Sequence, residues 1–324
     1  MATTNHIPEF VQRIRNGDIR ALSRAISAVE DHTPESTALL KALFPHTGNA
    51  VLLGFTGSPG AGKSTLVDQV AHSYRKQGKT VGVVAVDPTS PFSGGAILGD
   101  RIRMTSHHAD PGIFIRSMAT RGSLGGLAST TADVATVLDA SGRDLVMIET
   151  VGVGQDEVDI VRLADVTIVV LVPGMGDDVQ TIKAGIMEIA DIFVINKADR
   201  DGAERVEREI RALQSLAMRK DSWTPPIVKT VASSGSGIED LVATIEKYRS
   251  FLEQDDRARA RRIENWRGRI AEMLRDALFQ RVLSYYLSEG EAARYAAEVA
   301  DHRRDPYSLV EKIVEGLGSP HERN

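Results

Sequence analysis

The sequence predicts an α/β fold, in which a doubly wound, mostly parallel sheet lies between layers of helices. Short apolar runs rich in β-branched residues recur between residues 49 and 250, with helical segments between them. Strands that are apolar throughout are typical of parallel sheets, because helices cover both faces. A glycine-rich stretch also joins the first run to a helix, where such sheets bind ligands. We therefore expect a sheet domain over 49–250, with helical segments over 1–48 and 251–324.

The individual elements follow from local signals, taken in chain order. In the first segment Asp18 can cap a short helix, and Thr33 followed by Pro34 marks the start of the next one. In the last segment an apolar stripe with three- and four-residue spacing predicts a long helix over 262–287. A final helix should begin at Asp305 and Pro306. The predicted strands are residues 51–56, 81–87, 112–117, 144–149, 166–172, 191–196 and 226–231.

Composition and charge exclude several classes of protein. The 324 residues are 42% hydrophobic and 26% charged, as in an ordinary soluble protein of one large or two modest domains. A net charge of −5 argues against a general nucleic-acid binder. There is no cysteine, which excludes disulfides and thiolate metal sites. The longest apolar run is too short to cross a membrane, and no secretory signal is visible. We expect a cytoplasmic protein without membrane or nucleic-acid partners.

The stretch GSPGAGKST at residues 57–65 fits the pattern G-x-x-x-x-G-K-[ST], between a predicted strand and a predicted helix. That context is the one a phosphate-binding loop requires. Glycines let successive backbone N–H groups turn toward phosphate oxygens, and the N-terminus of the following helix attracts negative charge. Lys63 would neutralise the β- and γ-phosphates, and the Ser64 hydroxyl would ligate Mg²⁺. The predicted nucleotide-binding residues here are Ser58, Pro59, Gly60, Ala61, Gly62, Lys63, Ser64 and Thr65.

A second motif, VINKADR at residues 194–200, indicates the base. An aspartate at position 199 can accept hydrogen bonds from both N–H groups on one edge of guanine, whereas adenine presents a reversed pattern there. Asn196 and the stem of Lys197 would brace the loop and the ring. In the stretch TVASSGSGI at residues 230–238, Ala232 matches a loop that closes on guanine O6 in GTPases, so its backbone N–H is a further candidate. The predicted nucleotide is GTP or GDP.

The segment DLVMIETVGVGQDEVDI at residues 144–160 supplies a third element, an apolar strand followed by an acid and, three residues on, a glycine. The Gly152 N–H would sense the γ-phosphate, and Glu149 lies where Mg²⁺ or its water shell would be. A glutamate is one methylene longer than the commoner aspartate, which favours a water-bridged contact. Val153 stands where many small GTPases carry the glutamine that orients the attacking water. We therefore predict slow intrinsic hydrolysis that a partner stimulates.

The stretch VAVDPTSPFSGGAILGDRIRM at residues 84–104 is the most distinctive. Together with RGSLGGL at 121–127, ETVGVGQDE and NKAD, it resembles the MeaB/ArgK family of P-loop GTPases. The resemblance covers the whole 49–250 domain and extends into both helical flanks. It implies a GTPase chaperone of an adenosylcobalamin-dependent acyl-CoA mutase, methylmalonyl-CoA mutase or a close relative. Such a chaperone gates cofactor loading and protects or reactivates the mutase.

The resemblance also implies roles for three residues outside the motifs above. Asp87 and Asp100 would lie near Mg²⁺ and act in the first switch region. We place Asp87 at the end of a strand beside the phosphate-loop strand, and Asp100 on a glycine-rich loop. Lys183 belongs to a further switch loop near the partner interface. The alternatives are a turn at Asp87, a salt bridge from Asp100 to a nearby arginine, and an ordinary loop around Lys183.

The resemblance implies a homodimer, supported by the C-terminal helices. The D-x-H-x-x-G pattern of cobalamin-binding domains is missing, so adenosylcobalamin belongs to the partner. The run RARARR at 257–262 follows EQDD, which favours a solvated helix with internal ion pairs over a nucleic-acid patch. Two alternative functions remain open. One is a nickel-delivering GTPase, although such proteins usually carry cysteine or histidine tracts. The other is an ArgK-like kinase linked to amino-acid transport.

Overall fold

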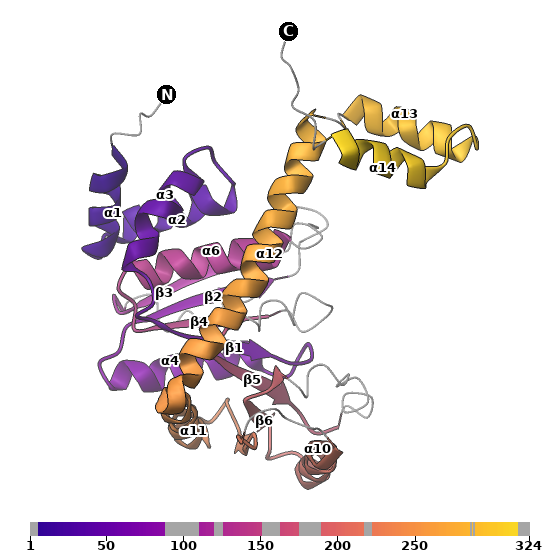
Figure 1. The fold of residues 1–324 in the computed structure, drawn as a ribbon. Coiled ribbons are helices and arrows are strands. Elements are labelled where there is room, and N and C mark those ends of the chain that lie inside the picture. The colour runs from indigo at the N-terminus through magenta and orange to yellow at the C-terminus, as the bar shows by residue number, and fades with distance from the viewer. Residues whose placement is uncertain are drawn as a thin grey trace. The chain divides into compact units, whose positions relative to one another are not determined.

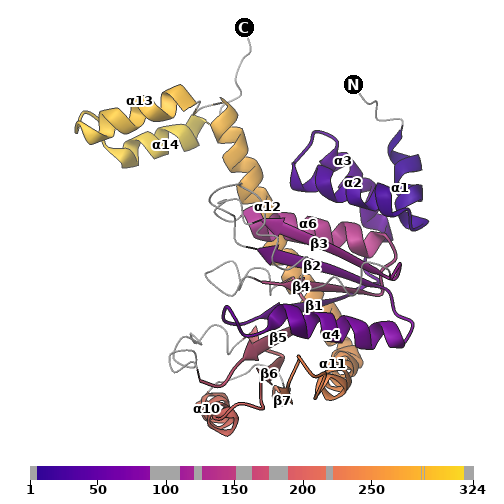
Figure 2. The same cartoon turned by 180° about the vertical axis from the view of Figure 1, so that it is seen from behind.

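The computed structural model describes residues 6–87, 110–119, 126–150, 163–174, 189–216, 222–285, 287 and 289–316. By its internal contacts the chain divides into two compact units, Met1–Arg262 and Ile263–Asn324. The first unit contains the sheet and its covering helices (Figures 1 and 2). The domain boundaries expected at residues 49 and 251 stay predictions.

Seven parallel strands form the sheet, which confirms the predicted fold class. Their order is β3-β2-β4-β1-β5-β6-β7, so β1 lies in the middle and every strand ends at the same edge. Ligands of open parallel sheets bind at that edge. The strands are β1 Val51–Thr56, β2 Val81–Asp87, β3 Ile113–Ala119, β4 Leu145–Glu149, β5 Val166–Leu171, β6 Ile192–Asn196 and β7 Ile227–Thr230.

Helices cover both faces of this sheet (Figures 1 and 2). Helices α4 (Lys63–Lys76) and α11 (Ile238–Glu253) pack on one face, where they share a core with alternate residues of the strands. Helices α6 (Gly126–Ala140) and α10 (Ala203–Leu216) pack on the other face, over different strands. Because both faces are buried, strands such as β5 are apolar at nearly every position, as the sequence indicates.

The N-terminal helices pack on the same side of the sheet as α6. Their apolar residues belong to the same core as those of α6 and of strands β2, β3 and β4. Asp18 caps α2 as predicted, accepting from the N–H groups of Arg20 and Ala21 at 2.9 and 3.0 Å. The prediction for α3 was wrong: Pro34 lies in a turn closed by a bond from Ser36 N–H to Thr33 O, and the helix begins at Ser36. The helices are α1 Ile7–Arg15, α2 Ile19–Glu30 and α3 Ser36–Leu43, and the short turns η2 Phe44–His46 and η4 Gln254–Asp256 are 3-10 helices.

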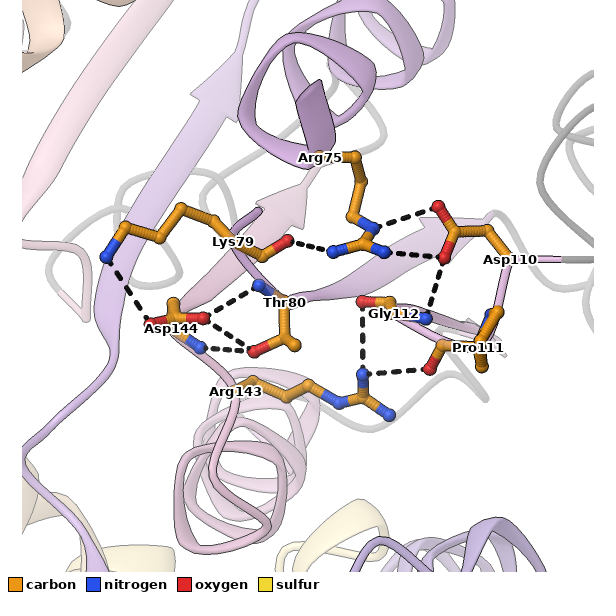
Figure 3. Close-up of polar contacts among 8 residues, drawn as sticks. All are labelled: Arg75, Lys79, Thr80, Asp110, Pro111, Gly112, Arg143 and Asp144. Atoms are coloured by element: carbon orange, nitrogen blue, oxygen red, sulfur yellow. Dashed lines mark hydrogen bonds and ion pairs between the residues drawn. The ribbon is translucent and has the colours of Figure 1, made fainter. Parts of the chain in front are cut away.

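A polar cluster closes the opposite edge of the sheet, where β2, β3 and β4 begin (Figure 3). Arg75, in the last turn of α4, donates to both oxygens of Asp110 at 2.9 and 2.8 Å. A β-carbon on Gly112 would lie 2.1 Å from the Arg75 guanidinium carbon, so any other residue here would displace that side chain from its present position. Nearby, the N–H and hydroxyl of Thr80 donate to Asp144 at 2.7 and 2.8 Å. These contacts fix the loops that enter three strands.

The second unit is helical in its described part. Helix α12 (Arg257–Tyr285) begins in the first unit and continues into the second, followed by α13 (Glu289–Ala300) and α14 (Pro306–Gly316). Asp305 accepts from Ser308 N–H at 2.8 Å, which confirms the predicted start of the last helix. Across the described ranges, no helix is both long and apolar enough to span a bilayer. The exposed apolar residues of α12 include Ile263, Trp266, Ile270, Met273, Leu274, Leu278 and Phe279.

Candidate nucleotide-binding site

The phosphate loop connects β1 to α4 at the carboxyl edge of the sheet. Gly57, Gly60 and Gly62 all have positive φ, at 141°, 78° and 85°. A β-carbon on Gly57 would lie 2.0 Å from the Val170 carbonyl oxygen, and one on Gly62 would lie 2.5 Å from Asn196 Nδ2. At Gly57 a β-carbon would displace main chain, and at Gly62 it would displace the Asn196 side chain, so both glycines are favoured by close approach as well as by backbone conformation.

Lys63 lies at the first position of α4 and is only 5% exposed. Its ammonium donates to Gly57 O at 2.6 Å and to Ser58 O at 3.1 Å. The charge is therefore held inside the curve of the loop, at the N-terminus of a helix, where the backbone also favours an anion. The arrangement offers an ammonium and backbone N–H groups to one ligand, and phosphate oxygens suit that donor set.

Ser64 and Glu149 bring the end of β4 to this loop. The Ser64 hydroxyl donates to Glu149 Oε1 at 2.7 Å, and both residues are buried, at 8% and 5% exposed. A hydroxyl and a carboxylate are hard oxygen donors of the kind that Mg²⁺ takes next to nucleotide phosphates. These residues therefore fit the expected ion. The neighbouring Thr65 is exposed.

Asn196 links the phosphate loop at 57–62 to the stretch at 230–238, which is predicted to close on the guanine base. It is 2% exposed, and its Nδ2 donates to Ala61 O at 2.8 Å. Its Oδ1 accepts from the Thr230 hydroxyl and from Ala232 N–H, both at 3.1 Å. The Ala232 N–H expected to face a base thus bonds to Asn196 in this structure. Thr230 was not among the predicted site residues. The signal that could have identified it is a hydroxyl residue near the end of a predicted strand, two positions before Ala232.

Lys197 and Asp199 follow β6 at the same edge. Lys197 has a φ of 56°, and its ammonium donates to Gly60 O at 2.7 Å, so its stem crosses toward the phosphate loop. Asp199 is exposed, as a carboxylate that meets an incoming base must be. The motif at 194–200 and the loop at 57–62 are therefore joined by two side chains, although 135 and 137 residues separate the bonded partners.

The prediction for the strand that carries Asp87 was wrong. Asp87 ends β2, but β4 lies between β2 and β1, so this strand is not beside the phosphate-loop strand. The inserted strand brings Glu149 next to the loop instead. Asp100, Gly152 and Lys183 lie outside the described residues. Among the residues that are described, no group of three or more His, Asp or Glu side chains is arranged to hold a metal ion.

Comparisons with known proteins agree on a family. The family described as methylmalonyl Co-A mutase-associated GTPase MeaB matches residues 22–286. A candidate GTPase of Pyrococcus abyssi is 49% identical over 317 residues, which cover 96% of this chain and 97% of the relative. The GTPase ArgK of Escherichia coli is 36% identical over 297 residues, covering 89% and 88%. The crystal structure of an LAO/AO transport system kinase superposes with a TM-score of 0.72 at 26% identity, covering 98% and 100%.

Proposed function

The chain belongs to the MeaB family of GTPases, and on that premise we propose that it binds GTP in the loop at 57–62 and hydrolyses it with Mg²⁺. The observation that carries the proposal is the position of the Lys63 ammonium, 2.6 Å from Gly57 O, in a loop whose first residue approaches β5 too closely for a β-carbon. Phosphoryl transfer needs positioning and charge stabilisation more than covalent participation of the protein, and this loop supplies both.

The side chains predicted to act on the nucleotide or the metal each have a place in this proposal. Lys63 exchanges its carbonyl contacts for the β- and γ-phosphate oxygens, and Gly152 senses the γ-phosphate. Ser64 and Glu149, with Asp87 and Asp100, hold Mg²⁺, which neutralises charge on the phosphates when bound. Asn196 fixes the two loops, Lys197 covers the base and Asp199 selects guanine. Lys183 reaches the nucleotide when a partner orders its loop.

The physiological role that we propose is a chaperone of an adenosylcobalamin-dependent acyl-CoA mutase. The description of the family, as mutase-associated, supports it. GTP binding and hydrolysis would gate cofactor loading and protect or reactivate the mutase, with the cobalamin held by the partner. Hydrolysis would be slow alone and faster with the mutase. We further propose a cytoplasmic homodimer. The same family description favours a mutase over nickel delivery.

A kinase is the second candidate, because the solved relative is titled a transport system kinase. Incubation with γ-labelled GTP, Mg²⁺ and candidate acceptors separates the two functions. The GTPase releases labelled phosphate to water at a rate independent of the acceptor, whereas a kinase transfers the label to it. An adenosylcobalamin-dependent mutase added to the same assay should raise phosphate release, and no rise with any acyl-CoA mutase of this class contradicts the chaperone role.

Guanine selectivity is tested at Asp199. Asp199→Asn should weaken GTP binding and improve binding of xanthosine triphosphate, because the asparagine amide offers a donor where the carboxylate offered an acceptor. Competition against a fluorescent GDP analogue measures both affinities. Unchanged selectivity would remove Asp199 from the base site.

A further inference from the structure

Two buried threonine hydroxyls meet where β1 and β4 end. Thr150 Oγ1 donates to Thr56 Oγ1 at 3.1 Å, and the residues are 2% and 0% exposed. Thr56 is the last residue of β1, and Thr150 directly follows β4. Phe55 pairs with Glu149 in the parallel register, and Thr150 N–H donates to Phe55 O at 3.0 Å. The two threonines therefore occupy equivalent places at the ends of neighbouring strands.

Each threonine adjoins a different part of the candidate site. Gly57, the first residue of the phosphate loop, follows Thr56. Glu149, which accepts from Ser64 at 2.7 Å, precedes Thr150. The hydroxyl pair is thus a direct side-chain link between the start of the phosphate loop and the end of β4. No residue of the motif G-x-x-x-x-G-K-[ST] contributes to this link.

The chemistry of the pair indicates a geometric role. Valine has nearly the shape of threonine and would fill the same buried space without a polar atom. Burying a hydroxyl is unfavourable unless it is hydrogen-bonded, and the bond between two hydroxyls gains little net stability over apolar packing. What the bond adds is direction: beside the main-chain bond from Thr150 N–H to Phe55 O, it fixes the relative orientation of the two strand ends, which an apolar contact leaves looser.

We propose that Thr150 is a positioning residue for GTP hydrolysis. Through Thr56 it keeps the end of β4, with Glu149, in position beside the phosphate loop. The inference rests on the proposed GTPase function and adds a residue that touches neither nucleotide nor metal. Because Glu149 is a predicted Mg²⁺ ligand, loss of the bond should appear in the metal dependence of hydrolysis more than in nucleotide affinity.

The test compares Thr150→Val, Thr56→Val, the double variant and Thr150→Ser. Thr244→Val is the matched control, because the Thr244 hydroxyl is bonded to Asp240 O on the exposed side of α11, outside the candidate site. Single-turnover hydrolysis is measured against Mg²⁺ concentration, with GDP affinity and thermal stability measured in parallel.

We expect each valine variant at the pair to slow hydrolysis about three- to tenfold, the size expected of one buried hydrogen bond, and to raise the Mg²⁺ concentration for half-maximal rate. GDP affinity without Mg²⁺ should stay within about twofold of wild type, since the phosphate loop keeps its donors. Because Thr150 acts through Thr56, the double variant should be no slower than Thr56→Val, and Thr150→Ser should approach wild type.

Hydrolysis and metal dependence equal to wild type in both single valine variants would overturn the inference while leaving the GTPase assignment intact. Additive losses in the double variant would also overturn it, because two independent effects add. If Thr150→Val is too unstable to assay, Thr56→Val decides: slower hydrolysis with a raised Mg²⁺ requirement supports the inference, and wild-type hydrolysis and metal dependence overturn it. Wild-type protein that neither binds nor hydrolyses GTP would instead refute the proposed function.

Discussion

At the scale of single residues, Gly57 makes the most exacting demand of the phosphate loop. Its φ of 141° is a backbone conformation that glycine adopts easily and other residues rarely adopt. A β-carbon here would also lie 2.0 Å from the Val170 carbonyl oxygen of β5, which is held in the sheet. Gly57→Ala should therefore weaken GTP binding about ten- to a hundredfold, the cost of 1–3 kcal/mol of backbone strain. Equilibrium titration with a fluorescent GTP analogue measures it.

The control for this variant is Gly48→Ala. Gly48 also has positive φ, 92°, but a β-carbon at this position would meet nothing within 4 Å. The variant should lose about 1 kcal/mol of stability and no GTP affinity. Equal GTP affinities in the two variants would contradict the close-approach argument.

The residues of the candidate site were the easiest part to predict, because short motifs report local chemistry. The spacing at 57–65 indicated the positions of Lys63 and Ser64, and both lie at the loop. The contacts of Asn196 were harder. Thr230 and Ala61 lie 34 and 135 residues away, and no local pattern identifies such partners. The same limit hid the bond between Thr56 and Thr150, which are 94 residues apart.

At the scale of elements, the start of α12 is anchored by an ion pair in which the carboxylate is buried and the arginine is 25% exposed. Arg261 donates to both oxygens of Asp191 at 3.0 and 2.7 Å, and Asp191 is 1% exposed. Although burial opposes it, the carboxylate raises the pKa of Arg261. The run at 257–262 was expected to be solvated with internal pairs, and Arg261 shows that prediction to be wrong at this residue. Sequence spacing could not reveal a partner 70 residues earlier.

Replacing Arg261 should strongly destabilise the folded protein. Arg261→Met leaves the Asp191 carboxylate without its cation and should lower the free energy of unfolding by about 3–5 kcal/mol. Arg205→Met removes an exposed pair with Glu209, whose partners are 73% and 33% exposed, and should cost about 0.5 kcal/mol or less. Urea denaturation of both variants gives the comparison. Equal losses would show that the buried pair has no special role in stability.

The polar cluster in Figure 3 predicts that the free energy of unfolding depends on pH. The N–H of Thr80, with its hydroxyl and Lys79, lowers the pKa of Asp144 below its ordinary value of 3.8. A carboxyl with a lowered folded pKa contributes stability that is present above the unfolded pKa and is lost as pH falls through the folded pKa. The side chain is 40% exposed, so screening limits the contribution to about 1 kcal/mol or less.

Asp144→Asn should remove that contribution. The variant should be less stable than wild type at pH 6, and the difference should shrink as the pH falls below about 4, because wild type then loses its advantage. Unfolding free energies from urea curves at several pH values measure the gap. A gap that stays constant down to pH 2.5 would contradict the assigned cause.

The order of the strands in the sheet could not be predicted from the individual elements. Their number and position follow from apolar runs, but pairing depends on long-range packing. We therefore placed β2 next to β1, whereas β4 lies between them. The start of α3 was misplaced for a local reason, since the Thr33 carbonyl closes a turn before the helix begins.

At the scale of the whole molecule, the proposed homodimer rests on α12. This 29-residue helix exposes Ile270 and Leu274 by 60% and 58%. An apolar face of this extent is typical of an interaction surface, and we propose a second copy of the chain as its partner. Wild type should elute as a dimer in size exclusion with light scattering, and Ile270→Asp with Leu274→Asp as a monomer. Gly268→Asp, on the other side of the same helix, where a β-carbon would meet nothing within 4 Å, should stay dimeric. A monomeric wild type at about 10 μM would contradict the proposal.

The central claim is that the loop at 57–62, with the ammonium of Lys63, holds the phosphates of GTP. Calorimetric titration of GTP with Mg²⁺ into wild type and Lys63→Ala tests it most directly. The account predicts one GTP per chain in wild type and no measurable binding in a variant that keeps its thermal stability. Lys63→Ala binding GTP as tightly as wild type would contradict it.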